Sequence, residues 1–249
     1  MTEWWRADPI IETHGGILVV RDDLLPGGSK QRFLPLLAGD AAEVVYGGPF
    51  CGGAAYALSV WAARESRKAT LFYAKRSSFH WRQREAFRLG ATIYQVPAGR
   101  INVVQARARA YAADHGALML PLGLDVPAAS EPFIAAMHGV RDRVGAIDEV
   151  WCCCGSGMLT RCLGTAFPDA SVIGVMVGLK SRSGKQAMPG NVRLIDSGYE
   201  FADECRDTAP FDSCGNYDRK AWAMCAAEAR RRPDVRRLFW NVGGSAPVT

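Results

Sequence analysis

The chain has 249 residues, of which 49% are hydrophobic and 22% charged, and its net charge is +5. This length allows one large domain or two modest ones, each able to bury a core. No stretch reaches the roughly 18 consecutive apolar residues of a membrane helix, and the start MTEWWRADP lacks the apolar run of a secretory signal. We therefore expect a soluble cytoplasmic protein with no membrane partner.

Short β-like runs alternate with helical patterns along the chain, which predicts an α/β fold with parallel strands. We expect strands at 16–22, 42–47, 69–74, 91–97, 117–121, 149–154, 171–177, 192–196 and 236–242. We expect helices at 53–67, 81–89, 102–115, 130–144, 158–166 and 218–232. The loop PLGLDVP at 121–127 interrupts the alternation and indicates a domain boundary.

The segment RDDLLPGGSKQRFL at 21–34 places one lysine at a strand-to-helix junction. A strand ends at Arg21-Asp22-Asp23, a Pro-Gly-Gly turn follows, and Ser29-Lys30 opens a helix. An ordinary surface lysine needs no Gly-Gly turn in front of it. The residues alone leave two interpretations of Lys30 open, a functional amine and a solvated side chain.

Two further segments join a strand, a glycine-rich loop and a helix. In WCCCGSGMLTRCLG, at 151–164, Gly155-Ser156-Gly157 precedes a helix whose first N–H groups could bind a phosphate. A similar arrangement is found in VYGGPFCGGAAYALSVWAA at 45–63. Two such helix starts suit a ligand with a phosphate and a substrate with a carboxylate. The alternative interpretation of both loops is that their glycines only allow tight turns and close packing.

Cysteine and charged residues give weaker signals. The eight cysteines include no C-x-x-C pair and the four histidines are scattered, so we expect buried cysteines and no metal site. Basic residues cluster at 64–88 and 230–237. Such clusters attract phosphates or form solvated helix faces, and the second interpretation is the more common.

In chain order, several segments resemble the aminocyclopropane-carboxylate (ACC) deaminase and D-cysteine desulfhydrase family of pyridoxal-phosphate (PLP) enzymes. Lys30 matches that family's Schiff-base lysine, and CGSGM at 154–158 resembles its phosphate loop. VRLIDSGYE at 192–200 matches the segment whose tyrosine lies over the cofactor, here Tyr199. GNYDRKAW at 215–222 matches a tyrosine followed by the partner of the pyridine nitrogen, here Tyr217 and Asp218. FWNVGGSAP at 239–247 resembles the terminal strand and its Gly-Gly turn.

The chain departs from the family at two loops. Phe50-Cys51-Gly52-Gly53 stands where the family has a Ser-Asn pair for the substrate carboxylate, so Cys51, Gly52 and Gly53 become the substrate-binding candidates. Met158 and Leu159 stand where glycine and threonine are usual in the phosphate loop, which leaves Thr160 as the nearest hydroxyl.

The resemblance implies the two-domain fold type II of PLP enzymes, with the cofactor in the cleft between the domains. Residues 1–40 and 126–249 would form the large domain and 41–125 a smaller inserted one. Lys30 would bind the cofactor and move the α-proton. Residues 155–158 and Thr160 would hold the phosphate, and Tyr199 and Tyr217 would orient groups or exchange protons.

Asp218 would hold a proton on the pyridine nitrogen, which favours demanding carbanion chemistry such as decarboxylation or ring opening. Its position before a helical run equally suits a helix N-cap, and the two roles are compatible.

The resulting hypothesis is a PLP-dependent lyase or deaminase that acts on a free small amino acid through a carbanion at its α-carbon. The altered loop and the basic clusters support an alternative, a bacteriophage enzyme of the host cytoplasm that remodels an amino acid attached to thymidine in DNA. A PLP-carrying binding or regulatory protein without turnover is a third candidate. A homodimer is compatible with all three.

Overall fold

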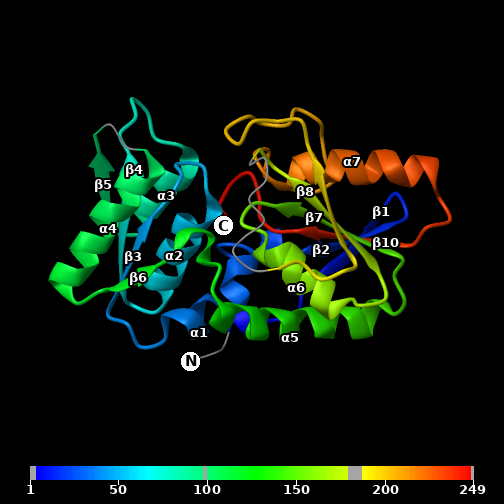
Figure 1. Ribbon diagram of the computed structural model, residues 1–249, viewed down its shortest axis with the longest axis horizontal. Helices are drawn as coiled ribbons and strands as arrows, with labels where there is room; N and C mark the ends of the chain where they lie inside the picture. The colour runs from blue at the N-terminus through cyan, green and yellow to red at the C-terminus, as the bar shows by residue number, and fades with distance from the viewer. Residues whose placement is uncertain (1–3, 98–99, 179–186, 248–249) are drawn as a thin grey trace. The chain divides into compact units, whose positions relative to one another are not determined.

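The computed structural model describes residues 4–97, 100–178 and 187–247. It divides into two compact units (Figure 1). Unit 1 comprises Met1–Leu25 and Ser130–Ser245, and unit 2 comprises Pro26–Ala129 with Ala246–Thr249. This division assigns residues 26–40 and 126–129 to unit 2, whereas the sequence analysis assigned them to the large domain.

Unit 1 is built on a six-stranded sheet in the order β1-β2-β10-β7-β8-β9. Only the β1–β2 pair is antiparallel, and the other neighbours are parallel. The strands are β1 (Ile11–His14), β2 (Ile17–Arg21), β7 (Glu149–Cys154), β8 (Ser171–Met176), β9 (Val192–Asp196) and β10 (Arg237–Asn241). The expected α/β fold with parallel strands is thereby confirmed. Strand β1 was missed because its sequence, IETH, has no run of apolar residues.

Helices cover both faces of this sheet (Figure 1). Helix α6 (Met158–Ala166) packs on one face, where Thr160 contacts Cys152. Helix α5 (Pro127–Val144) contributes Phe133, whose ring meets that of Trp240 at 6.4 Å. Helix α7 (Asp218–Arg231) covers the opposite face, where Trp222, Phe239 and their neighbours form an apolar core. The alternation of side chains along each strand explains why one strand supplies both cores.

Unit 2 is a four-stranded parallel sheet in the order β5-β4-β3-β6. Its strands are β3 (Glu43–Gly47), β4 (Lys68–Ala74), β5 (Thr92–Val96) and β6 (Leu118–Leu120), and its longer helices are α2 (Gly53–Arg64), α3 (Trp81–Arg88) and α4 (Ile101–His115). Helix α4 packs Val104 and Ala108 against Val45 and Phe72. Helices α2 and α3 lie on the other side of this sheet (Figure 1) and contact each other.

Short elements complete the two units. These are η1 (Trp4–Arg6), η2 (Asp22–Leu24), η3 (Ser29–Arg32), α1 (Leu34–Ala38) and η4 (Leu122–Leu124). All eight cysteines are buried, as expected. Among the helices of the described residues, none combines the length and apolar character needed to cross a bilayer. The described residues also contain no group of three side chains suited to bind a metal ion.

A buried ion pair joins β7 to β10 at the start of both strands. Arg237 Nε lies 2.9 Å from Glu149 Oε2, and both side chains are buried. Glu149 also accepts hydrogen bonds from Arg232 and from Trp151 Nε1. Burial by itself would raise the pKa of Glu149, but the hydrogen bonds from Trp151 and Arg232 hold this pKa below its ordinary value. The basic cluster at 230–237 is therefore partly a structural network.

We expect Glu149→Gln to lower the free energy of unfolding by about 3–5 kcal/mol, because Arg237 would remain buried without its counter-ion. Denaturant unfolding measured by circular dichroism tests this. The matched control is Glu85→Gln, which removes the partner of the exposed Arg88 and should cost no more than about 1 kcal/mol. Because the pKa of Glu149 is lowered in the folded state, its stabilisation is present near neutral pH and lost as the pH falls through that value. Equal losses of unfolding free energy in Glu149→Gln and Glu85→Gln would contradict a stabilising role of the buried Glu149–Arg237 pair.

Candidate active site

The loop at 155–157 connects β7 to α6 and leaves the start of this helix open. Gly157 occupies the N-cap position with φ +94°, a left-handed conformation that favours glycine. It has no side chain, so no side-chain cap bonds the first N–H groups of α6. Ser156 is half-buried in the same loop. These uncapped N–H groups and the helix dipole suit a phosphate.

The loop lies where the strand order of the sheet reverses. From β7 the chain continues to β8 and β9 on one side, and then returns to place β10 on the other side of β7. In open α/β sheets, ligands bind at the carboxyl ends of the strands at such a switch point.

Asp218 lies at the same switch point. It is only 1% exposed and is the first residue of α7. Its Oδ1 accepts hydrogen bonds from the N–H of Val242, 2.9 Å away, and from Cys153 Sγ, 3.3 Å away. The N-cap interpretation of Asp218 is wrong, because Tyr217 holds the N-cap position and the carboxylate is directed to β7 and the end of β10.

Tyr217 lies beside the glycine loop. A side-chain carbon added at Gly155 would meet Cε1 of Tyr217 at 3.4 Å. The Tyr217 ring also contacts Phe201 edge-to-face at 5.4 Å. Unit 1 therefore brings together three candidates from distant parts of the sequence, namely the loop at 155–157, Tyr217 and Asp218.

Tyr199 follows β9 and is positioned by two partners. Its Oη donates to Cys205 Sγ at 3.6 Å, and this hydrogen bond raises the pKa of Tyr199, so the phenol is protonated at neutral pH. Lys220 Nζ lies 5.4 Å from the Tyr199 ring and donates to the carbonyl oxygens of Val177 and Glu200. The sequence analysis missed Lys220. The sequence feature that could have revealed Lys220 is its place beside Ala221 and Trp222, on the apolar face of a predicted helix.

The other phosphate-loop candidates are deeply buried. Met158 is 3% exposed, and Thr160 is fully buried with its Oγ1 3.4 Å from Cys152 Sγ. The Thr160 hydroxyl therefore contacts the strand beneath the loop. Of the two hydroxyls that the sequence analysis proposed for the phosphate, Ser156 is therefore better placed than Thr160.

Lys30 lies in unit 2, in the turn between β2 and α1. Gly27 and Gly28 precede it with φ +88° and +76°, and a side chain at Gly27 would overlap Gln31. Lys30 itself is half-buried in η3. The next residue, Gln31, donates from Nε2 to the carbonyl oxygen of Ala57 at 2.7 Å. This bond ties the lysine segment to the N-terminal half of α2.

The substrate-loop candidates stand directly before α2, in the same unit. Cys51 is buried, and its carbonyl oxygen accepts a hydrogen bond from Arg82 Nη1 at 2.9 Å. Gly52 is the N-cap of α2 and provides no capping side chain. Gly53 has no atom within 4 Å of the position its side chain would take, so its backbone is open to a ligand.

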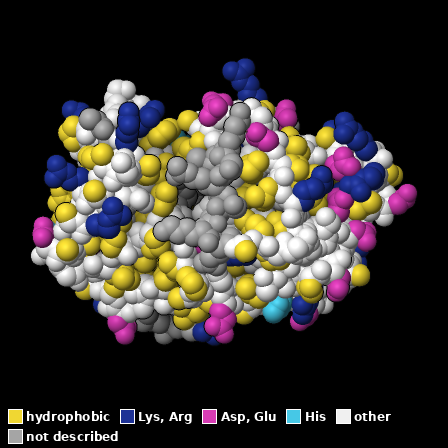
Figure 2. Space-filling view, in the orientation of Figure 1, with side chains coloured by type: hydrophobic (Ala, Val, Ile, Leu, Met, Phe, Trp, Pro, Cys, Tyr) yellow, Lys and Arg dark blue, Asp and Glu magenta, His cyan; other side chains and the backbone are white. Residues whose placement is uncertain are grey.

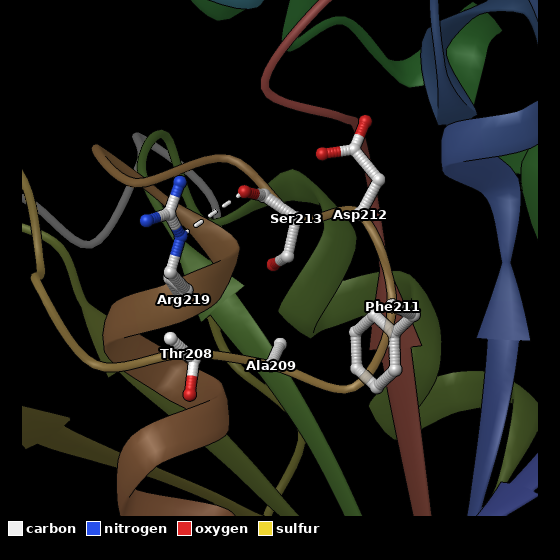
Figure 3. A pocket seen from close by; sticks show the side chains of 6 residues that line it. All are labelled: Thr208, Ala209, Phe211, Asp212, Ser213 and Arg219. Atoms are coloured by element: carbon white, nitrogen blue, oxygen red, sulfur yellow. Dashed lines mark hydrogen bonds between the residues drawn. The ribbon is translucent and has the colours of Figure 1, made fainter.

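A small pocket lies in the loop that precedes α7 (Figure 3). It is lined by Thr208, Ala209, Phe211, Asp212, Ser213 and Arg219, and its volume is about 120 Å³. Arg219 Nε donates to the carbonyl oxygen of Ser213 at 3.2 Å. Ligand pockets usually measure about 300–1,000 Å³, so this one is too small for a cofactor.

Searches with protein-family models found no match. A curated relative, the glycyl-dTMP PLP-dependent decarboxylase of Pseudomonas phage M6, is 25% identical over 186 residues. The match covers 65% of this chain and 65% of the relative, so the chain spans slightly less than two thirds of that protein.

Solved structures match almost the whole chain. A homologue of ACC deaminase superposes with a TM-score of 0.79 at 16% identity, over 96% of this chain and 90% of that one. A mutant of O-ureido-L-serine synthase superposes with a TM-score of 0.74 at 12% identity, over 98% of this chain and 91% of that one. Threonine deaminase isoform 2 of Solanum lycopersicum superposes with a TM-score of 0.69 at 12% identity, over 95% of this chain and 79% of that one. The chain has the fold of the type II PLP enzymes. The fold predicted from the sequence resemblance is therefore confirmed.

Proposed function

We propose that this protein is a PLP-dependent enzyme that labilises a bond at the α-carbon of an amino-acid substrate. One observation carries the proposal: the switch point of the unit 1 sheet combines an uncapped helix start with a buried carboxylate. The first suits the phosphate of the cofactor and the second its ring nitrogen. Lys30, on a glycine turn in unit 2, supplies the amine.

Different residues of the site bind different parts of the cofactor. The N–H groups of the 155–157 loop and of α6 bind the phosphate, and Ser156 adds a hydroxyl. Asp218 would accept a hydrogen bond from the protonated ring nitrogen, and Lys30 would hold the cofactor covalently. When bound, PLP withdraws electrons from the substrate α-carbon.

Lys30 and Asp218 control the positions of the protons. Lys30 Nζ takes the α-proton from the substrate and returns one to the product. Asp218 keeps the ring nitrogen protonated. Tyr199 and Tyr217 orient the bound groups, and the Tyr199 phenol is itself held by its hydrogen bond to Cys205 Sγ.

The test is to locate the covalent attachment. The protein purified with PLP should absorb visible light, and after borohydride reduction peptide mass spectrometry should find the adduct on Lys30. Lys68 is bonded to Glu43, and Lys220 is 1% exposed and donates to two carbonyl oxygens, so both are already engaged within the fold. An adduct on another lysine would refute the site.

For the substrate we propose two candidates. A free small amino acid is the substrate class named by several structural neighbours, such as threonine deaminase. An amino acid attached to a thymidine nucleotide is favoured by the phage decarboxylase relative. The Phe50-Cys51-Gly52-Gly53 loop, which lacks a Ser-Asn pair, supports the second candidate.

A difference spectrum recorded with free amino acids and with glycyl-thymidine nucleotide separates the substrate candidates. A host-cytoplasm location is proposed only together with the second candidate, as expected of a phage enzyme. No spectral change and no turnover with any of them would favour a PLP-carrying protein without catalysis.

A further inference from the structure

Positive charge is concentrated in unit 2. Residues 26–129 contain thirteen Lys and Arg against six Asp and Glu, whereas the rest of the chain has seventeen against nineteen. Unit 2 therefore carries a net charge of +7 and the remainder −2. Lys and Arg side chains are spread over the region of β4, β5, α3 and α4 in Figure 2. A surface of this charge attracts a polyanion.

Three arginines of the 230–237 cluster are engaged in internal contacts. Arg237 is buried on Glu149, Arg232 bonds Glu149 and Glu228, and Arg236 donates to backbone carbonyl oxygens. Arg237 therefore cannot bind a phosphate in this fold. The sequence analysis offered phosphate binding as one interpretation of the 230–237 cluster, and the burial of Arg237 argues against it for that residue.

Near the substrate loop, the guanidinium group of one arginine lies over an aromatic ring. The guanidinium carbon of Arg76 lies 3.8 Å from the centroid of the Phe50 ring. Arg76 is exposed, and its guanidinium makes no hydrogen bond or ion pair with the residues that the structure describes. Its outer face and its N–H groups are therefore available to a ligand. Arginine planes of this kind stack on nucleic-acid bases and bind phosphates.

A second arginine extends this cluster. The Phe50 ring contacts His80 at 6.0 Å, and Arg84 Nη1 donates to the carbonyl oxygen of Phe79 at 2.7 Å. Burial, and then the charges of Arg82 and Arg84, lower the pKa of His80 to about 4, so His80 is neutral and the local charge comes from the arginines. Arg84 is exposed.

The arginine cluster and the segment that contains Lys30 both contact helix α2. Arg82 bonds Cys51 just before α2, the Tyr56 ring of α2 contacts Trp81 at 5.3 Å, and Gln31 bonds Ala57 of α2. One element thus positions both the proposed covalent anchor and the arginine cluster.

We propose that Phe50, Arg76 and Arg84 form a subsite for a DNA strand, in which Arg76 stacks on a base and Arg76 and Arg84 bind phosphates. The proposal rests on the proposed function, since it identifies the polymer that carries the amino-acid substrate. Phe50 is a positioning residue that holds the Arg76 plane.

The experiment measures binding of a fluorescent single-stranded thymidine oligonucleotide to the PLP-loaded protein across a salt series. We expect the double variant Arg76→Ala, Arg84→Ala to reduce the slope of log affinity against log salt by about 1.4, since each single-strand phosphate contact contributes about 0.7. Arg76→Lys keeps the charge and loses the plane, so the slope should persist while affinity falls roughly five- to hundredfold. Phe50→Leu should resemble Arg76→Lys.

The control is Arg88→Ala. Arg88 lies on helix α3, as Arg84 does, but it is already paired with Glu85. It should change affinity by less than about twofold. An equal loss with Arg88→Ala, binding of poly-glutamate as tight as that of the oligonucleotide, or no binding at low salt would each overturn the proposal. Thermal melting of every variant checks that it is folded.

Failure of this inference is distinguishable from failure of the proposed function. The visible absorbance of bound PLP is recorded on the same samples, and Lys30→Ala should bind the oligonucleotide as the wild type does. Oligonucleotide binding without PLP attachment would refute the enzyme proposal alone. PLP attachment without oligonucleotide binding would refute the subsite alone.

Discussion

Lys30→Ala is expected to abolish the visible absorbance of the protein purified with PLP and to lower turnover by at least about 10²–10⁴-fold. The alanine can neither bind the cofactor covalently nor move the α-proton, and loss of a proton-transfer group has an effect of this size. Because Lys30 is half-buried in a short turn, the free energy of unfolding should change by no more than about 1 kcal/mol. Absorbance, turnover and denaturant unfolding are measured on the same preparation.

Lys75→Ala is the matched control, because Lys75 is an exposed lysine of the same unit. It should keep both the visible band and the borohydride adduct. A visible band that survives in Lys30→Ala would show that the glycine turn at 26–28 serves another purpose.

Asp218→Asn should leave PLP bound but lower the rate of α-proton exchange by roughly ten- to hundredfold. Asparagine keeps an oxygen that can accept from Val242 N–H, but it loses the charge that holds a proton on the ring nitrogen. Loss of a charge-assisted hydrogen bond is worth roughly 1.5–3 kcal/mol, which corresponds to this range. Exchange in deuterated buffer is followed by NMR with the amino compound that gives the largest difference spectrum.

Asp234→Asn provides the control, since Asp234 is exposed beyond the C-terminal end of α7. It should retain the wild-type exchange rate. If Asp218→Asn exchanges protons as fast as the wild type and only melts earlier, Asp218 serves the structure of the β7–β10 junction alone.

Much of the fold could be predicted from local pattern. The strands at 149–154 and 192–196 and the helix at 158–166 lie where the sequence analysis placed them. Each has a continuous local signal, such as the apolar run EVWCCC followed by a glycine loop. Helix α5 begins three residues before the expected start, at Pro127, because proline suits the first turn of a helix.

The candidate site was less predictable, because its contacts join residues far apart in the chain. Asp218 resembled a helix cap in the sequence, yet its partners are Val242 and Cys153. The sequence analysis interpreted the 230–237 run as either a phosphate-binding cluster or a solvated helix face, yet Arg237 is buried on Glu149. No local pattern reveals such pairs, since the parallel strand order alone makes β7 and β10 neighbours.

The sequence by itself determined the α/β alternation, the glycine turn that presents Lys30 and the open start of helix α6, because each depends on residues within one turn or loop. Tertiary structure alone decided which carboxylates and arginines are buried, and it brought Asp218 and Tyr217 to the 155–157 loop. It also placed the guanidinium group of Arg76 over the Phe50 ring. These outcomes depend on the packing of distant segments, whose burial and hydrogen bonding set the role of every charged group.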